Sequence, residues 1–175
     1  MKSSTSLSSS PEIKATVLKK ITVLGATGSI GLNTLDIIRQ FPQKFRVEAL
    51  SCRNSIEQLS LQIREFKPRV VCVDTSEQAR ELVETFHSRH SCPETEFVWG
   101  KEGLKQISSD PEVDLVVAGI VGAAGLEPTF AAVEAGKIVA VANKEPLVMA
   151  GELLVQTAKK TGAKLLPTDS EHNAI

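Results

Sequence analysis

The chain reads Ile-Thr-Val-Leu-Gly-Ala-Thr-Gly-Ser-Ile-Gly from residue 21 to residue 31, and this stretch decides the fold. Its first four residues are apolar or β-branched and predict a strand, while the residues that follow the glycines predict a helix. Gly25 permits a tight turn with unusual backbone dihedrals, Gly28 permits close approach of a phosphate group, and Gly31 lets the helix pack closely on the strand. A strand, a glycine-rich turn and a helix in this order predict a turn that binds the pyrophosphate of a dinucleotide.

The start of the expected helix strengthens this interpretation. Its N-terminus would present unpaired N–H groups and the positive end of the helix dipole to the phosphates. Thr27 and Ser29 would add hydroxyl donors. The glycine spacing is G-x-x-G-x-x-G, a variant of the usual dinucleotide fingerprint, and a structural turn without a ligand is the alternative.

Beyond the turn, short apolar and β-branched runs alternate with longer amphipathic ones. Strands that alternate with helices form a parallel sheet covered on both faces, and their connections are right-handed. We therefore predict a doubly wound, Rossmann-like α/β domain. The expected strands are residues 21–24, 46–50, 70–73, 96–99 (a weaker pattern), 115–118, 138–142 and 164–166. The expected helices are residues 30–40, 56–66, 77–87, 129–135 and 147–161.

The composition of the 175 residues excludes several classes of protein. Hydrophobic residues make up 42% and charged residues 23%, as in ordinary globular proteins, and the net charge is −1. Such a balance predicts neither nucleic acid nor an anionic membrane as a partner. No apolar run approaches the roughly 18 residues needed to cross a bilayer. Cys52, Cys72 and Cys92 are an odd number without metal-type pairing, which is typical of free thiols in a reducing compartment.

The two ends of the chain differ from its middle. Residues 1–19 begin with a Ser/Thr-rich segment and predict a disordered tail without the apolar centre of a secretory signal. We expect a cytoplasmic protein; a plastid-type organelle is the alternative if the tail belongs to a transit peptide. The last expected strand is followed by a helix that only begins, so we expect a fragment of a longer protein.

The end of the second expected strand predicts which dinucleotide binds. An acidic residue there would contact the ribose 2′-hydroxyl of NAD, whereas a basic residue accommodates the 2′-phosphate of NADP. The chain reads Leu-Ser-Cys-Arg-Asn-Ser at 50–55, without an acid. Arg53 offers a charged fork suited to phosphate, and Asn54 and Ser55 can donate hydrogen bonds. The sequence favours NADPH; a solvated loop arginine is the alternative.

Asn143, Lys144 and Glu145 follow the strand expected at 138–142. They therefore lie at the carboxyl edge of the sheet, where ligands bind in such folds. Lys144 could pair with a substrate phosphate or hydroxyl. A helix start capped by Asn143, with Glu145 in its first turn, explains the residues equally well.

Asp169, Ser170 and Glu171 follow the last expected strand at the same edge. Two carboxylates this close can converge on Mg²⁺ or Mn²⁺ through oxygen ligands. Two are too few to complete an octahedral site, so substrate, water or further residues would supply the other ligands. An N-terminal helix cap is the alternative.

Together these segments closely resemble the 1-deoxy-D-xylulose 5-phosphate reductoisomerase family from residue 20 to the end of the chain. The resemblance rests on ITVLGATGSIG, REFKP, AGIVGAAGLEPT, ANKE and PTDSEHNAI. It implies conversion of 1-deoxy-D-xylulose 5-phosphate to 2-C-methyl-D-erythritol 4-phosphate in non-mevalonate isoprenoid biosynthesis, with NADPH and a divalent cation, by a homodimer when full length. It also implies an NADPH-binding domain at 20–167 and the start of a catalytic domain at 168–175, whose remainder is absent.

The resemblance assigns roles to residues by matched position. Lys144, Ser170 and Glu171 would contact substrate, and Asp169 and Glu171 would bind the metal. The family often has Gly-Lys-Asn or Gly-Ser-Asn where this chain has 53–55, and a serine where it has Pro146. The residues expected to contact the cofactor are Gly25, Thr27, Gly28, Ser29, Ile30, Gly31, Arg53, Asn54, Ser55, Asn143 and Glu145.

Two other functions compete with this interpretation. The first is another NADP-dependent reductase or dehydrogenase, such as a semialdehyde dehydrogenase, which needs a catalytic cysteine. Cys52 lies near the expected cofactor loop and Cys72 inside a strand, so neither position suggests one. The second is a non-catalytic NADP-binding module, which loss of Asp169 or Glu171 would have favoured; both residues are present.

Overall fold

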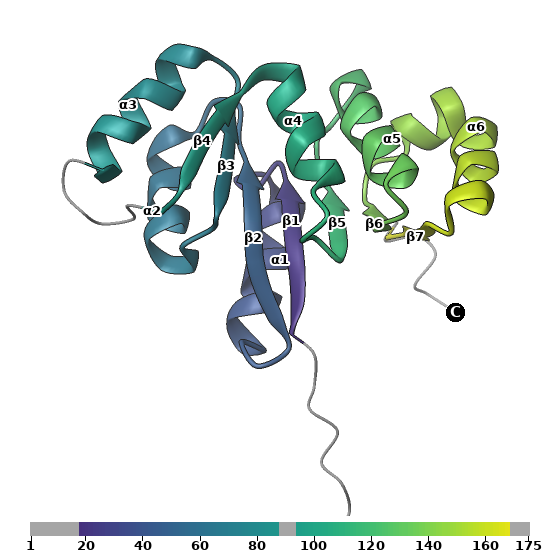
Figure 1. Cartoon of the computed structure of the whole chain (residues 1–175), viewed down its shortest axis with the longest axis horizontal. Helices are drawn as coiled ribbons and strands as arrows, with labels where there is room; N and C mark the ends of the chain where they lie inside the picture. The colour runs from purple at the N-terminus through teal and green to yellow at the C-terminus, as the bar shows by residue number, and fades with distance from the viewer. Residues whose placement is uncertain (1–17, 88–93, 169–175) are drawn as a thin grey trace, which may run out of the picture.

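A computed structural model describes residues 18–87 and 94–168. Within them, seven parallel strands form one sheet in the order β4-β3-β2-β1-β5-β6-β7, which Figure 1 shows from left to right. The strands are β1 (Lys19–Leu24), β2 (Phe45–Ser51), β3 (Val70–Val73), β4 (Glu96–Trp99), β5 (Leu115–Ala118), β6 (Ile138–Val141) and β7 (Lys164–Pro167). The helices are α1 (Ser29–Gln40), α2 (Ile56–Phe66), α3 (Ser76–His87), α4 (Gly100–Ser109), α5 (Leu126–Glu134) and α6 (Glu145–Thr161), with a 3₁₀ turn, η1, at Ala123–Gly125.

The order of the strands reverses at β1. From β1 the chain builds outward through β2 and β3 to β4, then returns to pair β5 with the free side of β1, and continues to β6 and β7. All six strand pairings are parallel. The doubly wound α/β prediction is confirmed. In such sheets the crevice outside the carboxyl ends of the strands at the reversal point is where ligands bind.

Two separate apolar cores cover the two faces of the sheet. Ile21 and Val23 of β1 point to the face where buried side chains of α1, α2 and α3 pack. Leu24 points to the opposite face, where buried side chains of α4, α5 and α6 pack. Successive strand residues alternate between faces, so a strand buried on both sides must be apolar at nearly every position. This is why the strands show no polar alternation.

Helix α4 was missing from the sequence-based prediction. Its ten residues contain Gly100, Gly103 and two serines, which favour a helix poorly, and only two large apolar side chains, Leu104 and Ile107. A Cβ on Gly103 would lie 3.0 Å from Cys72 Sγ and 3.1 Å from Val98 Cγ2. The glycine that weakens the helical pattern therefore lets α4 lie directly against β3 and β4.

Two other helices begin earlier than expected. Helix α5 begins at Leu126 and α6 at Glu145, whereas the sequence predicted starts at 129 and 147. Pro128 and Pro146 lie within the first turns, where the missing N–H has no intrahelical partner to lose. No helix in the described ranges is long and apolar enough to cross a membrane.

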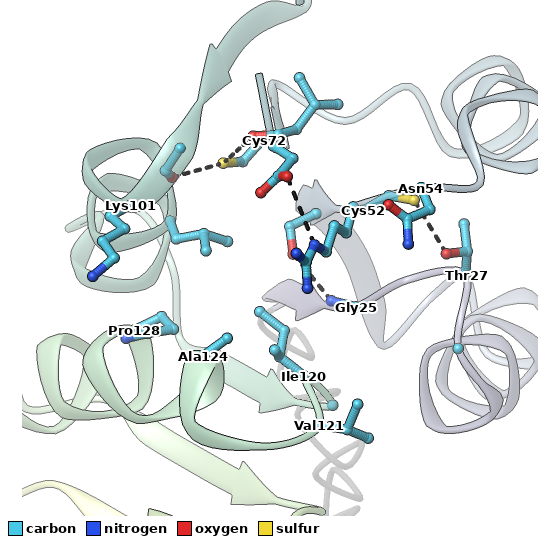
Figure 2. A pocket seen from close by; sticks show the side chains of 18 of the residues that line it. Gly25, Thr27, Cys52, Asn54, Cys72, Lys101, Ile120, Val121, Ala124 and Pro128 are labelled. Carbon is cyan, nitrogen blue, oxygen red and sulfur yellow. Dashed lines mark hydrogen bonds and ion pairs between the residues drawn. The ribbon is translucent and has the colours of Figure 1, made fainter. Parts of the chain in front are cut away.

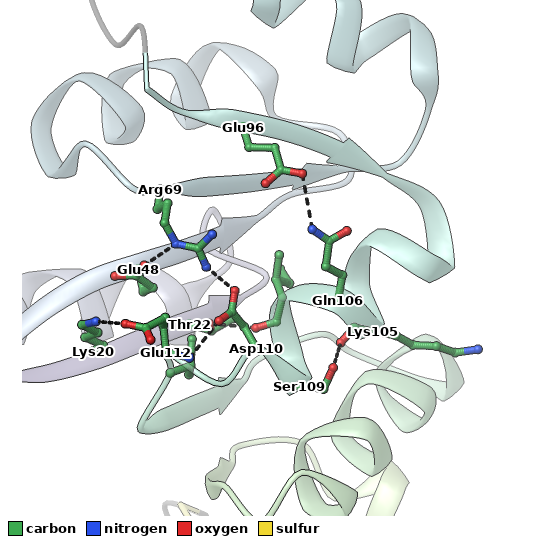
Figure 3. Close-up of polar contacts among 12 residues, drawn as sticks. Lys20, Thr22, Glu48, Arg69, Glu96, Lys105, Gln106, Ser109, Asp110 and Glu112 are labelled. Carbon is green, nitrogen blue, oxygen red and sulfur yellow. Dashed lines mark hydrogen bonds and ion pairs between the residues drawn. The ribbon is translucent and has the colours of Figure 1, made fainter.

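A charged cluster ties segments together at the amino edge of the sheet (Figure 3). Arg69 Nε donates to Glu48 Oε1 at 2.6 Å, and the same guanidinium pairs with Asp110. The Glu48 side chain is only 4% exposed although it belongs to β2. The pairing of β1 with β2 shifts at this point, so that Ile21 opposes Val47 and Thr22 opposes Ala49. The shift leaves Glu48 without a cross-strand partner in β1.

We predict that Arg69→Met lowers the free energy of unfolding by about 2 kcal/mol, because it leaves the Glu48 carboxylate buried without its counter-ion. Urea denaturation measures the difference. Lys105→Met is the control, since Lys105 pairs with Glu102 on an exposed helix surface. This control should change stability by less than about 0.5 kcal/mol. Equal effects of the two substitutions would contradict the prediction.

Candidate functional site

A cavity of about 770 Å³ lies at the carboxyl edge of the sheet, at the point where the strand order reverses. The loops after β1, β2 and β3 line one part of it, and the start of α4 and the segment 119–128 line the rest. Figure 2 shows Thr27 and Asn54 on one side and Lys101 on the other. Six residues predicted to contact the cofactor line this cavity: Gly25, Thr27, Gly28, Arg53, Asn54 and Ser55.

The glycine-rich turn adopts the geometry that the sequence predicted. Gly25 has φ +78°, which side chains rarely tolerate. A Cβ on Gly31 would lie 2.4 Å from Gly25 O and 2.6 Å from Ala26 C, so α1 packs on the turn at a distance that only glycine permits. A Cβ on Gly28 would meet nothing closer than 3.4 Å. The protein itself therefore does not require glycine at position 28, which leaves room for a group that approaches from the cavity.

Two buried polar side chains hold the turn in place. The Ser51 hydroxyl accepts a hydrogen bond from Gly25 N at 3.0 Å, and Ser51 O accepts one from Ala26 N at 2.8 Å. Gln62 of α2 donates from Nε2 to Ala26 O at 2.9 Å. The turn is thus fixed by β2 and α2 in the protein without a ligand.

The N-terminus of α1 begins at the rim of the cavity. Gly28 is the N-cap residue, and no described side chain caps this end of the helix. The first turn holds no acidic residue. The arrangement leaves the positive end of the helix for an anion. Ser29, Ile30 and Gly31 follow in the helix and do not line the cavity.

Arg53 lies in the loop between β2 and α2, with its side chain 76% exposed and its Nε 3.7 Å from Asp74 Oδ2. Asn54 and Ser55 complete this loop at the cavity. No acid follows β2 directly; the acid nearest Arg53 is Asp74, which follows β3 and also lines the cavity. Asp74 was not predicted as a site residue, although it directly follows the strand expected at 70–73; its position after a strand of a parallel sheet was the signal that could have indicated it.

Other lining residues were also missed. Lys101 and Leu104 come from α4, and Lys101 Nζ lies 3.4 Å from Glu127 Oε1 of α5. Gly119 also lines the cavity, with Ile120, Val121 and Ala124, which Figure 2 shows below Lys101. The Gly-rich composition of 119–125 was the signal that could have indicated this wall.

Asn143, Lys144 and Glu145 do not line this cavity. Asn143 donates from Nδ2 to Ile120 O at 2.7 Å and so fixes a segment that does line it. Asn143 does not cap α6, because the N-cap residue is Lys144, and Glu145 begins the helix. The predicted contacts of these three residues with cofactor or substrate stay predictions.

Asp169, Ser170 and Glu171 lie outside the described residues. Within the described ranges, no group of three or more His, Cys, Asp or Glu side chains could hold a metal ion. Two described cysteines, Cys52 and Cys72, are buried and free. Burial, with a smaller contribution from Asp74, raises the pKa of the Cys72 thiol to about 12. A thiol that stays protonated at neutral pH is a poor nucleophile, which argues against a catalytic role for Cys72.

Comparison with known proteins identifies the family. The model of the 1-deoxy-D-xylulose 5-phosphate reductoisomerase family matches residues 21–151. The chain belongs to this family. A curated 1-deoxy-D-xylulose 5-phosphate reductoisomerase from Dechloromonas aromatica (strain RCB) is 52% identical over 158 residues, which are 90% of this chain and 39% of the relative. The chain thus spans about two-fifths of the length of this relative.

Solved structures of reductoisomerases share the fold. A DOX-P reductoisomerase in complex with NADPH, fosmidomycin and magnesium superposes with a TM-score of 0.84 at 48% identity, over 90% of this chain and 38% of that one. The 1-deoxy-D-xylulose 5-phosphate reductoisomerase from Zymomonas mobilis, in complex with NADPH, gives a TM-score of 0.82 at 36% identity, over 90% and 40% of the two chains. The residues that match the reductoisomerase family model include the glycine turn.

We predict that an added methyl group lowers the free energy of unfolding by different amounts at Gly31 and Gly28 of the glycine-rich turn. Gly31→Ala should lower the free energy of unfolding by about 2–3 kcal/mol, because the new Cβ meets fixed backbone atoms. Gly28→Ala should cost less than about 1 kcal/mol, since its φ of −80° suits alanine and its Cβ meets only ordinary contacts. Urea denaturation of both variants tests this. Equal destabilisation would refute the different roles of the two glycines.

Proposed function

We propose that the cavity binds NADPH as the cofactor site of a 1-deoxy-D-xylulose 5-phosphate reductoisomerase. One observation carries this proposal: the glycine turn and the Arg53 loop line the same cavity at the reversal point of the sheet. The pyrophosphate would lie at Gly25–Gly28 and the N-terminus of α1, and the 2′-phosphate at Arg53, Asn54 and Ser55. Two related structures that contain NADPH support this assignment.

The whole protein would convert 1-deoxy-D-xylulose 5-phosphate to 2-C-methyl-D-erythritol 4-phosphate in non-mevalonate isoprenoid biosynthesis. Hydride transfer is the chemistry of the cofactor, and the protein supplies placement and electrostatics. Asn143 and Glu145 would contact the cofactor, and Lys144 the substrate. Asn143 is tied to Ile120 at the cavity wall, which supports a place for this segment near the cofactor.

A divalent cation, Mg²⁺ or Mn²⁺, would be held by Asp169 and Glu171, with Ser170 and Glu171 at the substrate. Two carboxylates fit the oxygen ligands that such hard cations take. The cation supplies Lewis-acid polarisation of a substrate oxygen when bound. A related DOX-P reductoisomerase structure contains magnesium.

The proposed NADPH-binding domain spans residues 20–167, and residues 168–175 would open the catalytic domain. The full-length protein would be a cytoplasmic homodimer. Since the chain spans about two-fifths of a related reductoisomerase, the remaining parts of the substrate site would come from other residues.

We predict that Arg53→Ala weakens NADPH binding about tenfold and leaves NADH binding nearly unchanged, because a charge-assisted contact to the 2′-phosphate is lost. Titration of cofactor fluorescence with each nucleotide measures both affinities. Arg80→Ala is the matched control, since Arg80 is an exposed arginine of α3 that does not line the cavity. Equal weakening of NADPH and NADH by Arg53→Ala would argue against a 2′-phosphate contact.

We further predict that the 175-residue chain alone does not oxidise NADPH when given 1-deoxy-D-xylulose 5-phosphate and Mn²⁺, because a catalytic site needs more ligands and substrate contacts than these residues offer. Absorbance of NADPH at saturating substrate provides the measurement. A full-length reductoisomerase under the same conditions is the positive control. Rapid substrate-dependent oxidation by the chain would refute the prediction. NADPH binding without turnover is the result expected.

A further inference from the structure

Asp74 faces the proposed 2′-phosphate site from the end of β3. Its Oδ2 lies 3.7 Å from Arg53 Nε, and both residues line the cavity. The Asp74 side chain is 51% exposed, so its carboxylate is available to solvent and to a ligand. The guanidinium expected to bind a phosphate is thus already paired with an anion.

Gln78 joins the backbones of the two loops that carry Arg53 and Asp74. Its Oε1 accepts hydrogen bonds from the backbone N–H groups of Asp74 at 3.0 Å and Thr75 at 3.1 Å, while its Nε2 donates to Arg53 O at 3.0 Å. The Thr75 hydroxyl in turn accepts from Gln78 N at 3.3 Å, which completes a capping box at the start of α3. One side chain therefore joins the loop after β2 to the loop after β3, so the backbone of Asp74 has a defined place beside that of Arg53.

The other charged residues that line the cavity form their own pair. Lys101 and Glu127 lie 3.4 Å apart on α4 and α5. Within the described residues that line the cavity, Asp74 is therefore the acid paired with Arg53. The net charge of Arg53 and Asp74 together is near zero, although a site for NADPH gains affinity from a positive net charge.

We propose that Asp74 is a specificity-determining residue that lowers the preference of this site for NADPH over NADH. The inference rests on the proposed cofactor function. A 2′-phosphate, with a charge of about −1.5 to −2, would take Arg53 from Asp74 and then face an unpaired carboxylate. NADH has no such phosphate and leaves the pair intact. Asp74 thus lowers the affinity only for the nucleotide that carries a 2′-phosphate.

The geometry of the protein without a ligand indicates whether Asp74 favours or opposes binding of the 2′-phosphate. Asp74 could also favour phosphate binding by holding Arg53 in place. The 3.7 Å separation is too long for a hydrogen bond, however, and both side chains are largely exposed. Such pairs contribute little to order or stability. Repulsion between the carboxylate and the phosphate arises only in the complex, so the net effect of Asp74 opposes NADPH.

The test compares Asp74→Asn with the unchanged chain in titrations of NADPH and NADH. The substitution keeps the size of the side chain and removes its charge. We expect the affinity for NADPH to rise about two- to fivefold and the affinity for NADH to change by less than about 1.5-fold. The gain should shrink at high salt, because the charges involved are exposed. A purely structural effect of the substitution would change the affinities for both nucleotides by the same factor.

Glu77→Gln is the matched control. Glu77 carries the same charge in the first turn of α3, three residues beyond Asp74, and does not line the cavity. This variant should leave the ratio of the two affinities unchanged. Thermal unfolding of both variants identifies any loss of folded protein.

Two failures can be told apart. An unchanged chain that shows no preference for NADPH would overturn the proposed function, and the role of Asp74 with it. A chain that prefers NADPH, but whose Asp74→Asn variant shows an equal or smaller preference, would overturn the role of Asp74 alone. Weaker binding of both nucleotides would also overturn it, since Asp74 would then be a direct contact to their common part.

Discussion

The whole site depends on the close approach of backbone segments where β1, β5 and α1 meet. A Cβ on Gly25 would lie 3.0 Å from Gly119 O, and a Cβ on Gly119 would lie 2.9 Å from Leu24 O. A Cβ on Gly31 of α1 would lie 2.4 Å from Gly25 O in the same turn. Two glycines of the turn and Gly119, which lies far from them in the sequence, therefore let two neighbouring strands and one helix converge. The cavity opens where they converge, so the position of the site is a consequence of this contact.

The walls of the cavity differ in chemistry because they come from opposite faces of the sheet. The loops after β1 and β2 offer backbone N–H groups, a helix N-terminus and the Arg53 side chain, all suited to phosphate. The opposite wall, from α4 and the segment 119–128, contributes apolar surface from Leu104, Ile120 and Pro128. A ligand with a charged phosphate backbone and flat rings fits such a division. The reversal of strand order brings the two walls together.

The sequence predicted those features that depend on neighbours along the chain. The turn at 25–31 and the loop at 53–55 are each complete within a few residues, so their positions followed from a strand pattern and a glycine spacing. Features that depend on distant residues were missed. Asp74 lies near Arg53 because Gln78 joins the backbones of their two loops, and α4 can pack closely on the sheet because Gly103 leaves room for Cys72 and Val98. Asn143 had two local interpretations, and its actual partner, Ile120 O, lies 23 residues earlier.

The charged cluster of Glu48, Arg69 and Asp110 lies at the amino edge of the sheet, whereas the cavity lies at the carboxyl edge. The length of the strands separates this charged cluster, which stabilises the fold, from the Arg53 side chain at the proposed ligand site. The Arg53 side chain is 76% exposed, and its ion pair with Asp74 lies at the surface. A substitution at this position can therefore alter the selection of a nucleotide by the proposed site with little effect on the free energy of unfolding.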